Sequence, residues 1–153
     1  PFVRHHNIKY GGQFPIWVAV ELFTFGMLGS LFDLMRENDQ RAVSREYNLS
    51  PESLSRLIAS AVDVRNICAH YNRLYNRVLE EQPLLPNRLH LYESDRLFPL
   101  LLAFAHVLGR ERVLNRLITG LSLLETDFPE ADLSLCGFPE DWRSILEAEA
   151  AQA

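Results

Sequence analysis

The chain has 153 residues, of which 48% are hydrophobic and 23% charged, a composition typical of one soluble globular domain. It excludes disordered and collagen-like chains, and two cysteines are too few for a disulfide framework. The net charge of -5 is uneven, because residues 1–124 carry fourteen basic and twelve acidic side chains, whereas residues 125–153 carry Arg143 and eight acidic ones. A nucleic-acid partner is therefore not excluded for the first 124 residues.

No secretion signal opens the chain, so we expect a cytoplasmic protein with reduced cysteines. The apolar stretch 16–35 contains Glu21 and Asp33, each of which costs about 3 kcal/mol in mid-bilayer, so we expect a buried helix and no membrane partner. Because the first residue is Pro1, we expect a piece of a longer product. The predicted organisation is an irregular arm over residues 1–14, one helical domain over 15–149 and a tail over 150–153.

The spacing of apolar residues predicts an all-α fold, a bundle of five or six helices. A first helix is predicted over residues 15–36, where Gly26 and Gly29 would let a neighbouring helix approach closely. Trp17 and Trp142 are expected in the core. Ser50 as N-cap and Pro51 at the first helical position predict a long helix. This long helix is expected over residues 51–79. The other helices are expected over residues 39–47, over 95–108 with an end at Gly109, over 110–124 with a start at Arg110, and from residue 139 onward.

The segment over residues 65–77 carries polar groups at helical spacing. At about 100° per residue, Asn66, His70, Arg73 and Arg77 would share one stripe, turned away from the apolar side of the helix. A lone histidine in a helical pattern is more often a structural residue than a catalytic one. An exposed Arg and Asn face with an incidental His is equally compatible with this spacing.

Arg65, four further residues and then His70 resemble the Arg-x4-His motif of the HEPN superfamily of all-helical ribonucleases. The wider pattern resembles the Abi-like (abortive infection) family within that superfamily, as the C-terminal part of a longer member, and implies a HEPN-like bundle. The segments that carry the resemblance are residues 2–6, 9–12, 15–18, 25–26, 65–70, 72–77 and 137–142, together with Glu21.

This resemblance implies a toxin-like, metal-independent endoribonuclease in abortive-infection defence against phage, with no cofactor. The RNA 2′-OH would attack the adjacent phosphate, and His70 would move a proton, since imidazole side chains can act as acid or base near neutral pH. Arg65 would neutralise charge in the transition state, and Asn66 would hydrogen-bond the substrate or the imidazole. These three are the predicted catalytic residues.

Further residues are assigned around this motif. Arg73, Arg77 and Asn72 are expected to bind RNA phosphates, and the supporting residues are His6, Glu21 and Tyr71. One motif supplies one imidazole, so we expect a homodimer that brings two copies together, as the resemblance also implies. A toxin must be restrained, which implies an antitoxin or a regulatory RNA as partner. Cys68 and His70 are poorly spaced as metal ligands, and no metal site is expected.

Two other interpretations remain open at this point. The same fold could be a non-catalytic RNA-binding or protein-interaction module, in which the arginines bind without cleaving. It could also be a structural dimerisation domain whose polar stripe closes an interface. The acidic segment over residues 125–153 is expected to be solvated and frayed, with coverage of the arginine face as the alternative.

Overall fold

The structure, a computed structural model, describes residues 2–108 and 111–152, and these residues contain helices and no strand. The predicted all-α class is confirmed. The predicted helix end at Gly109 and helix start at Arg110 lie outside the described residues, as do Pro1 and Ala153. The helices are α1 (Phe2–Tyr10), α2 (Ile16–Val20), α3 (Phe25–Asp33), α4 (Glu37–Arg45), α5 (Pro51–Ala69), η1 (Asn87–Tyr92), α6 (Leu97–Leu108), α7 (Glu111–Asp127), η2 (Leu133–Cys136) and α8 (Trp142–Gln152).

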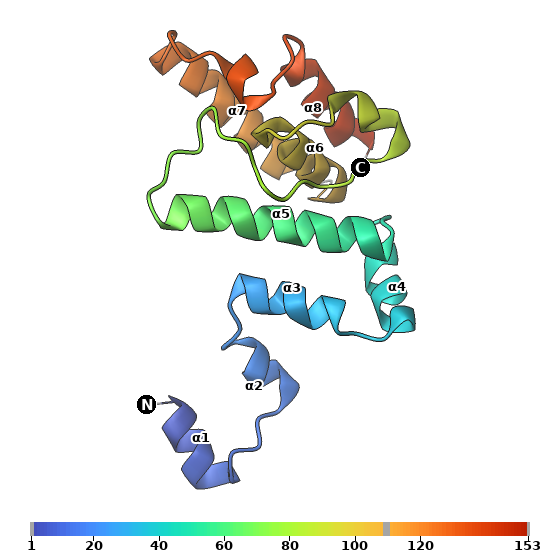
Figure 1. The fold of residues 1–153 in the computed structure, drawn as a ribbon, viewed down its shortest axis with the longest axis vertical. Coiled ribbons are helices and arrows are strands. Elements are labelled where there is room, and N and C mark those ends of the chain that lie inside the picture. Colours follow the sequence, from blue (N-terminus) through green and yellow to red (C-terminus); the bar gives the residue numbers. More distant parts are fainter. Residues whose placement is uncertain (1, 109–110, 153) are drawn as a thin grey trace.

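Helix α5 lies in the middle of the fold, with α3 on one side and α6, α7 and α8 on the other (Figure 1). The main apolar core lies on the α6–α8 side and includes Phe98, Leu102 and Leu146, which are fully buried. Trp142 belongs to this core, as predicted. Trp17 does not, because its side chain is 72% exposed, so its predicted place in the core is wrong.

The N-terminal part of the chain folds differently from the prediction. Within the predicted irregular arm over residues 1–14, residues 2–10 form the helix α1, and Gly11 and Gly12, both with positive φ, follow its end. The predicted helix over residues 15–36 is two helices, because the hydroxyl of Thr24 accepts a hydrogen bond from the Met27 N–H and starts α3 anew. These divisions explain why eight α-helices occur in residues 2–108 and 111–152, where the sequence suggested five or six.

The start of α5 agrees with the prediction. The hydroxyl of Ser50 accepts a hydrogen bond from the Ser53 N–H at 3.0 Å, and Pro51 is the first helical residue. The two glycines of α3 also act as predicted. A Cβ atom at Gly29 would lie 3.0 Å from Ile58 Cγ2, and one at Gly26 would lie 3.7 Å from Val62 Cγ1. Helix α3 therefore packs closely on α5 through these positions.

Most acidic side chains of residues 125–152 are exposed to solvent, as predicted, but Glu149 forms specific contacts that hold the C-terminal helix. Helix α8 continues to Gln152, through the predicted tail, and Glu149 is buried. Both carboxylate oxygens of Glu149 accept hydrogen bonds from Arg88, at 3.0 and 2.9 Å. His106 lies 3.6 Å from the same carboxylate. This cluster joins α8 to η1 and α6. Within the described parts of the chain, no helix combines the length and apolar character needed to cross a membrane.

Gly29→Val should lower the free energy of unfolding by about 1–3 kcal/mol, because the added side chain would force α3 away from Ile58. Urea denaturation followed by circular dichroism measures this change. Gly120→Val is the matched control, since no atom lies within 4 Å of a Cβ at Gly120. Equal stability of the Gly29→Val protein and the parent would contradict the close helix contact.

Glu149→Gln should lower the free energy of unfolding by about 2 kcal/mol, because it removes the charge that receives both hydrogen bonds from Arg88. Glu147→Gln, at an exposed position of the same helix, should change stability by less than about 0.5 kcal/mol. If the two variants melt at the same temperature, the Arg88–Glu149 pair does not stabilise the C-terminal helix.

Candidate functional site

Helix α5 ends at Ala69, ten residues before the predicted end. Two backbone hydrogen bonds close the helix, from Tyr71 N–H to the Cys68 carbonyl at 3.2 Å and from Asn72 N–H to the Ile67 carbonyl at 3.0 Å. This pair is the Schellman motif, whose closing residue is left-handed and usually glycine. Here Tyr71 occupies it with a φ of 53°. The sequence contains no glycine at this position, so the apolar periodicity predicts a longer helix than the structure has.

This early end removes the predicted polar stripe. Asn66 lies in the last turns of α5 and His70 is its C-cap residue, whereas Arg73 and Arg77 lie in the loop that follows. The helical angles predicted for these two arginines therefore do not apply. Their positions depend on how the loop is held by the rest of the fold.

The loop over residues 70–79 is attached to the C-terminal part of the molecule. The hydroxyl of Tyr75 donates to the Asp132 carbonyl at 3.2 Å and accepts from the Asp132 N–H at 3.0 Å. Arg96 donates to the Asn76 side-chain oxygen at 3.0 Å. These contacts hold Tyr75 and Asn76 in the middle of the loop. Arg73 and Arg77, which precede and follow them in the sequence, remain exposed.

Asp132 also starts η2, next to this loop attachment. Its carboxylate accepts a hydrogen bond from the Ser134 N–H at 2.9 Å. Hydrogen bonds from the hydroxyl and the backbone N–H of Ser134 hold the pKa of Asp132 below its ordinary value. The carboxylate therefore remains ionised, and η2 remains capped, throughout the neutral pH range.

The predicted catalytic residues share the C-terminal end of α5. Arg65 and His70 are exposed, Asn66 is half-buried, and Arg65 Nη1 donates to Asn66 Oδ1 at 2.9 Å. Asn72 is exposed, and the Tyr71 side chain is 99% exposed. The imidazole of His70 and the guanidinium group of Arg65 are thus exposed at the end of α5, and the guanidinium groups of Arg73 and Arg77 are exposed in the adjoining loop.

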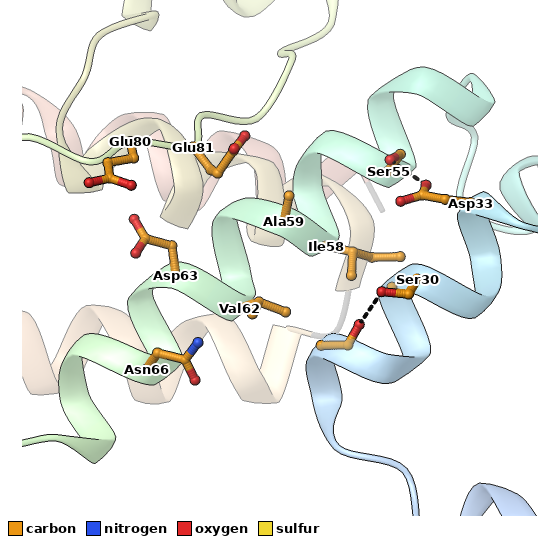
Figure 2. A pocket seen from close by; sticks show the side chains of 12 residues that line it. Ser30, Asp33, Ser55, Ile58, Ala59, Val62, Asp63, Asn66, Glu80 and Glu81 are labelled. Atoms are coloured by element: carbon orange, nitrogen blue, oxygen red, sulfur yellow. Dashed lines mark hydrogen bonds between the residues drawn. The ribbon is translucent and has the colours of Figure 1, made fainter.

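An acidic pocket of about 350 Å³ runs along α5 from Ser55 to Asn66, between α3, α5 and the segment containing Glu80 and Glu81. Figure 2 shows Asp63, Glu80 and Glu81 at one end of the pocket with Asn66, and Asp33 at the other end, where it accepts a hydrogen bond from Ser55. Sequence reasoning missed this cluster, because its four carboxylates are separated by up to 48 positions (81 − 33). The packing of α3 on α5 supplies Asp33, and the segment that follows the loop supplies Glu80 and Glu81.

The acidic pocket bears on the charge around Asn66. Asn66 lines the pocket together with Asp63, Glu80 and Glu81, whereas Arg65, His70 and Arg73 do not line it. Carboxylates repel a phosphate group, so the pocket itself is unfavourable for a phosphate.

Tyr71, one of the three predicted supporting residues, directly follows His70, whereas His6 and Glu21 lie elsewhere. His6 is half-buried in α1, where its ring stacks on Phe14 with centroids 5.0 Å apart. Glu21 is the exposed C-cap of α2. Neither residue lines the pocket that Asn66 lines. No group of three His, Cys, Asp or Glu side chains in residues 2–108 and 111–152 is placed to hold a metal ion.

Comparison with known proteins gives one match. Residues 1–76 match the family model described as Abi-like protein. The matched range includes α1 to α5, Arg65, His70 and Arg73, and it ends before Arg77 and before the segment 137–142. No curated protein and no solved structure matched the chain.

Tyr71→Gly should raise the free energy of unfolding by about 1 kcal/mol, because glycine adopts the left-handed conformation without the strain of a side chain. The tyrosine ring is exposed, so little packing is lost. Asn48→Gly is the matched control at a φ of 54°, and its gain should be smaller because asparagine tolerates this conformation. Urea denaturation of both variants checks the difference, and a destabilised Tyr71→Gly protein would contradict the left-handed helix end.

Proposed function

The chain belongs to the Abi-like protein family, as shown over residues 1–76, and from this premise we propose that it is a HEPN-type, metal-independent endoribonuclease. The family suggests a function related to abortive infection. The proposal adds the reaction: cleavage of RNA through attack of a 2′-OH on the adjacent phosphate, with a 2′,3′-cyclic phosphate and a free 5′-OH as products.

The observation that carries this proposal is the position of His70. Its imidazole is exposed at the C-cap of α5, and Arg65 and Arg73 are exposed five residues before it and three after it. The Schellman hydrogen bonds and the loop contacts of Tyr75 hold the backbone on which these side chains stand. An imidazole exchanges protons near neutral pH, and a guanidinium stabilises the added negative charge of the phosphorane-like transition state.

Electrostatics gives the substrate a preferred side. Arg65, Arg73 and Arg77 attract phosphates, while Asp63, Glu80 and Glu81 repel them from the neighbouring pocket. In this arrangement the scissile phosphate lies outside the acidic pocket, near His70 at the end of α5 and Arg73 in the loop that follows. Asn66, already bonded to Arg65, then acts mainly by orienting that guanidinium.

A homodimer is the second part of the proposal. Cleavage benefits from both a base and an acid, and each chain has one imidazole in this segment. A two-fold axis near the C-terminal end of α5 would place two His70 and two Arg65 side chains at one cleft. The exposure of these residues leaves them available for such an interface. Control by an antitoxin or a regulatory RNA stays a prediction.

His70→Ala should lower the rate of RNA cleavage by at least about 100-fold, because the proton-transfer group is removed. Gel analysis of a labelled single-stranded RNA in excess EDTA measures the rate, and a DNA of the same sequence should remain intact for lack of a 2′-OH. His90→Ala is the matched control, since His90 is an exposed histidine paired with Glu93 in η1. Arg65→Ala should lower the rate similarly.

Cleavage that survives His70→Ala, or that requires a divalent cation, would refute the proposed reaction. The non-catalytic alternative rests on the exposure of Arg65, Arg73 and Arg77, which could bind phosphates without cleavage. It predicts salt-sensitive RNA binding that His70→Ala leaves intact and Arg73→Ala weakens, without any cleavage by the parent protein.

A further inference from the structure

A second pocket, lined largely by aromatic rings, lies at the N-terminal end of the molecule. It has a volume of about 670 Å³, within the range of ligand sites, and it is formed by α1, the following turn and α2. Four of its seven lining residues carry aromatic rings, namely His6, Tyr10, Phe14 and Trp17. None of the residues of the Arg65–His70 segment lines it.

The turn between α1 and α2 creates this pocket. Gly11 and Gly12 adopt φ values of 62° and 77°, which are easily reached only by residues without a side chain. They reverse the chain so that Phe14 returns to α1, where its ring stacks on that of His6 with an interplanar angle of 16°. The centroid of the Tyr10 ring lies 5.0 Å from that of His6.

The pocket is open to solvent and is not part of the core. Trp17 is 72% exposed and Tyr10 is 51% exposed, although both line the pocket. A large exposed ring in a pocket is a typical feature of a binding surface, since single-stranded nucleic acids place unpaired bases on such rings. Aliphatic side chains are a minority of the lining, which favours a flat, stacking ligand over an apolar helix.

Charge supports a nucleic acid as that ligand. Residues 1–20 contain no Asp or Glu, whereas Arg4 and Lys9 are exposed on α1. The Lys9 amino group lies 5.4 Å from the centroid of the Tyr10 ring, next to the pocket. A phosphate chain could therefore follow α1 while a base enters the pocket, and the Gln13 side chain is placed there to hydrogen-bond a base edge.

We propose that the pocket formed by His6, Tyr10, Phe14 and Trp17 binds an unpaired base of single-stranded RNA. This site is separate from the proposed cleavage site, and its binding does not require cleavage. It gives the protein a second contact with RNA, away from the arginines that follow α5, and selects unpaired over duplex RNA because a base in a helix cannot enter the pocket.

The test measures binding in the His70→Ala background, so that the RNA remains intact, with a fluorescently labelled 12-nucleotide oligoadenylate. Trp17→Ala should raise the dissociation constant about tenfold, whereas Trp17→Phe, which keeps a ring, should raise it less than threefold. Ile16→Ala is the matched control, because Ile16 is an exposed apolar residue of the same helix that does not line the pocket. It should leave the dissociation constant within twofold of the parent.

Tryptophan fluorescence gives an independent readout. The sequence contains two tryptophans, and Trp142 is 4% exposed, so quenching by added oligoadenylate reports on Trp17. We expect quenching by the single strand, loss of this quenching in Trp17→Phe, and little quenching by the duplex with oligouridylate. Circular dichroism confirms that each variant is folded.

Equal RNA affinities of Trp17→Ala and the parent would overturn the proposal, and so would quenching by the duplex that is as strong as quenching by the single strand. If the RNA affinity is unchanged but Trp17→Ala alters the sedimentation of the protein, this surface joins copies of the chain instead. These outcomes are distinct from failure of the proposed nuclease, which is judged by cleavage in the parent protein and not by binding to this pocket.

Discussion

The left-handed residue at the end of α5 is the constraint on which the candidate site depends. Two backbone hydrogen bonds stop the helix at Ala69, and Tyr71 accepts a conformation that costs a non-glycine residue roughly 1–2 kcal/mol. If α5 continued beyond Ala69, His70, Arg73 and Arg77 would lie on one face of a longer helix. The stop instead places His70 at the rim and turns Arg73 into a loop that η2 and Arg96 hold in place.

Carboxylates line the groove along α5 up to the candidate site. Asp63, Glu80 and Glu81 lie at the Asn66 end of the acidic pocket, and Asp33 lies at its other end, where Ser55 donates to it. The close packing of α3 on α5 through Gly29 brings Asp33 to the pocket. Helices α1 and α2, by contrast, carry basic and aromatic side chains without acidic ones.

Much of the fold followed from local signals. Ser50 and Pro51 marked the start of α5, the two glycines marked a close helix contact, and Trp142 was correctly expected in the core. The failures share a cause. Thr24 and Tyr71 divide or end helices without a proline or glycine at the break, and apolar periodicity continues across both positions. The exposed Trp17 was missed because an apolar residue in a helical pattern is assigned by default to the core.

The sequence by itself determined the helical class, the family and the residue types available for chemistry, since these depend on composition, periodicity and local motifs. Only the tertiary structure decided which of those residues meet. The acidic pocket joins positions 33 to 81, the bidentate Arg88–Glu149 pair ties η1 to α8, and the aromatic pocket needs the reversal at Gly11 and Gly12. Such contacts depend on how helices pack and where they end, and neither property follows from the spacing of residues along one helix.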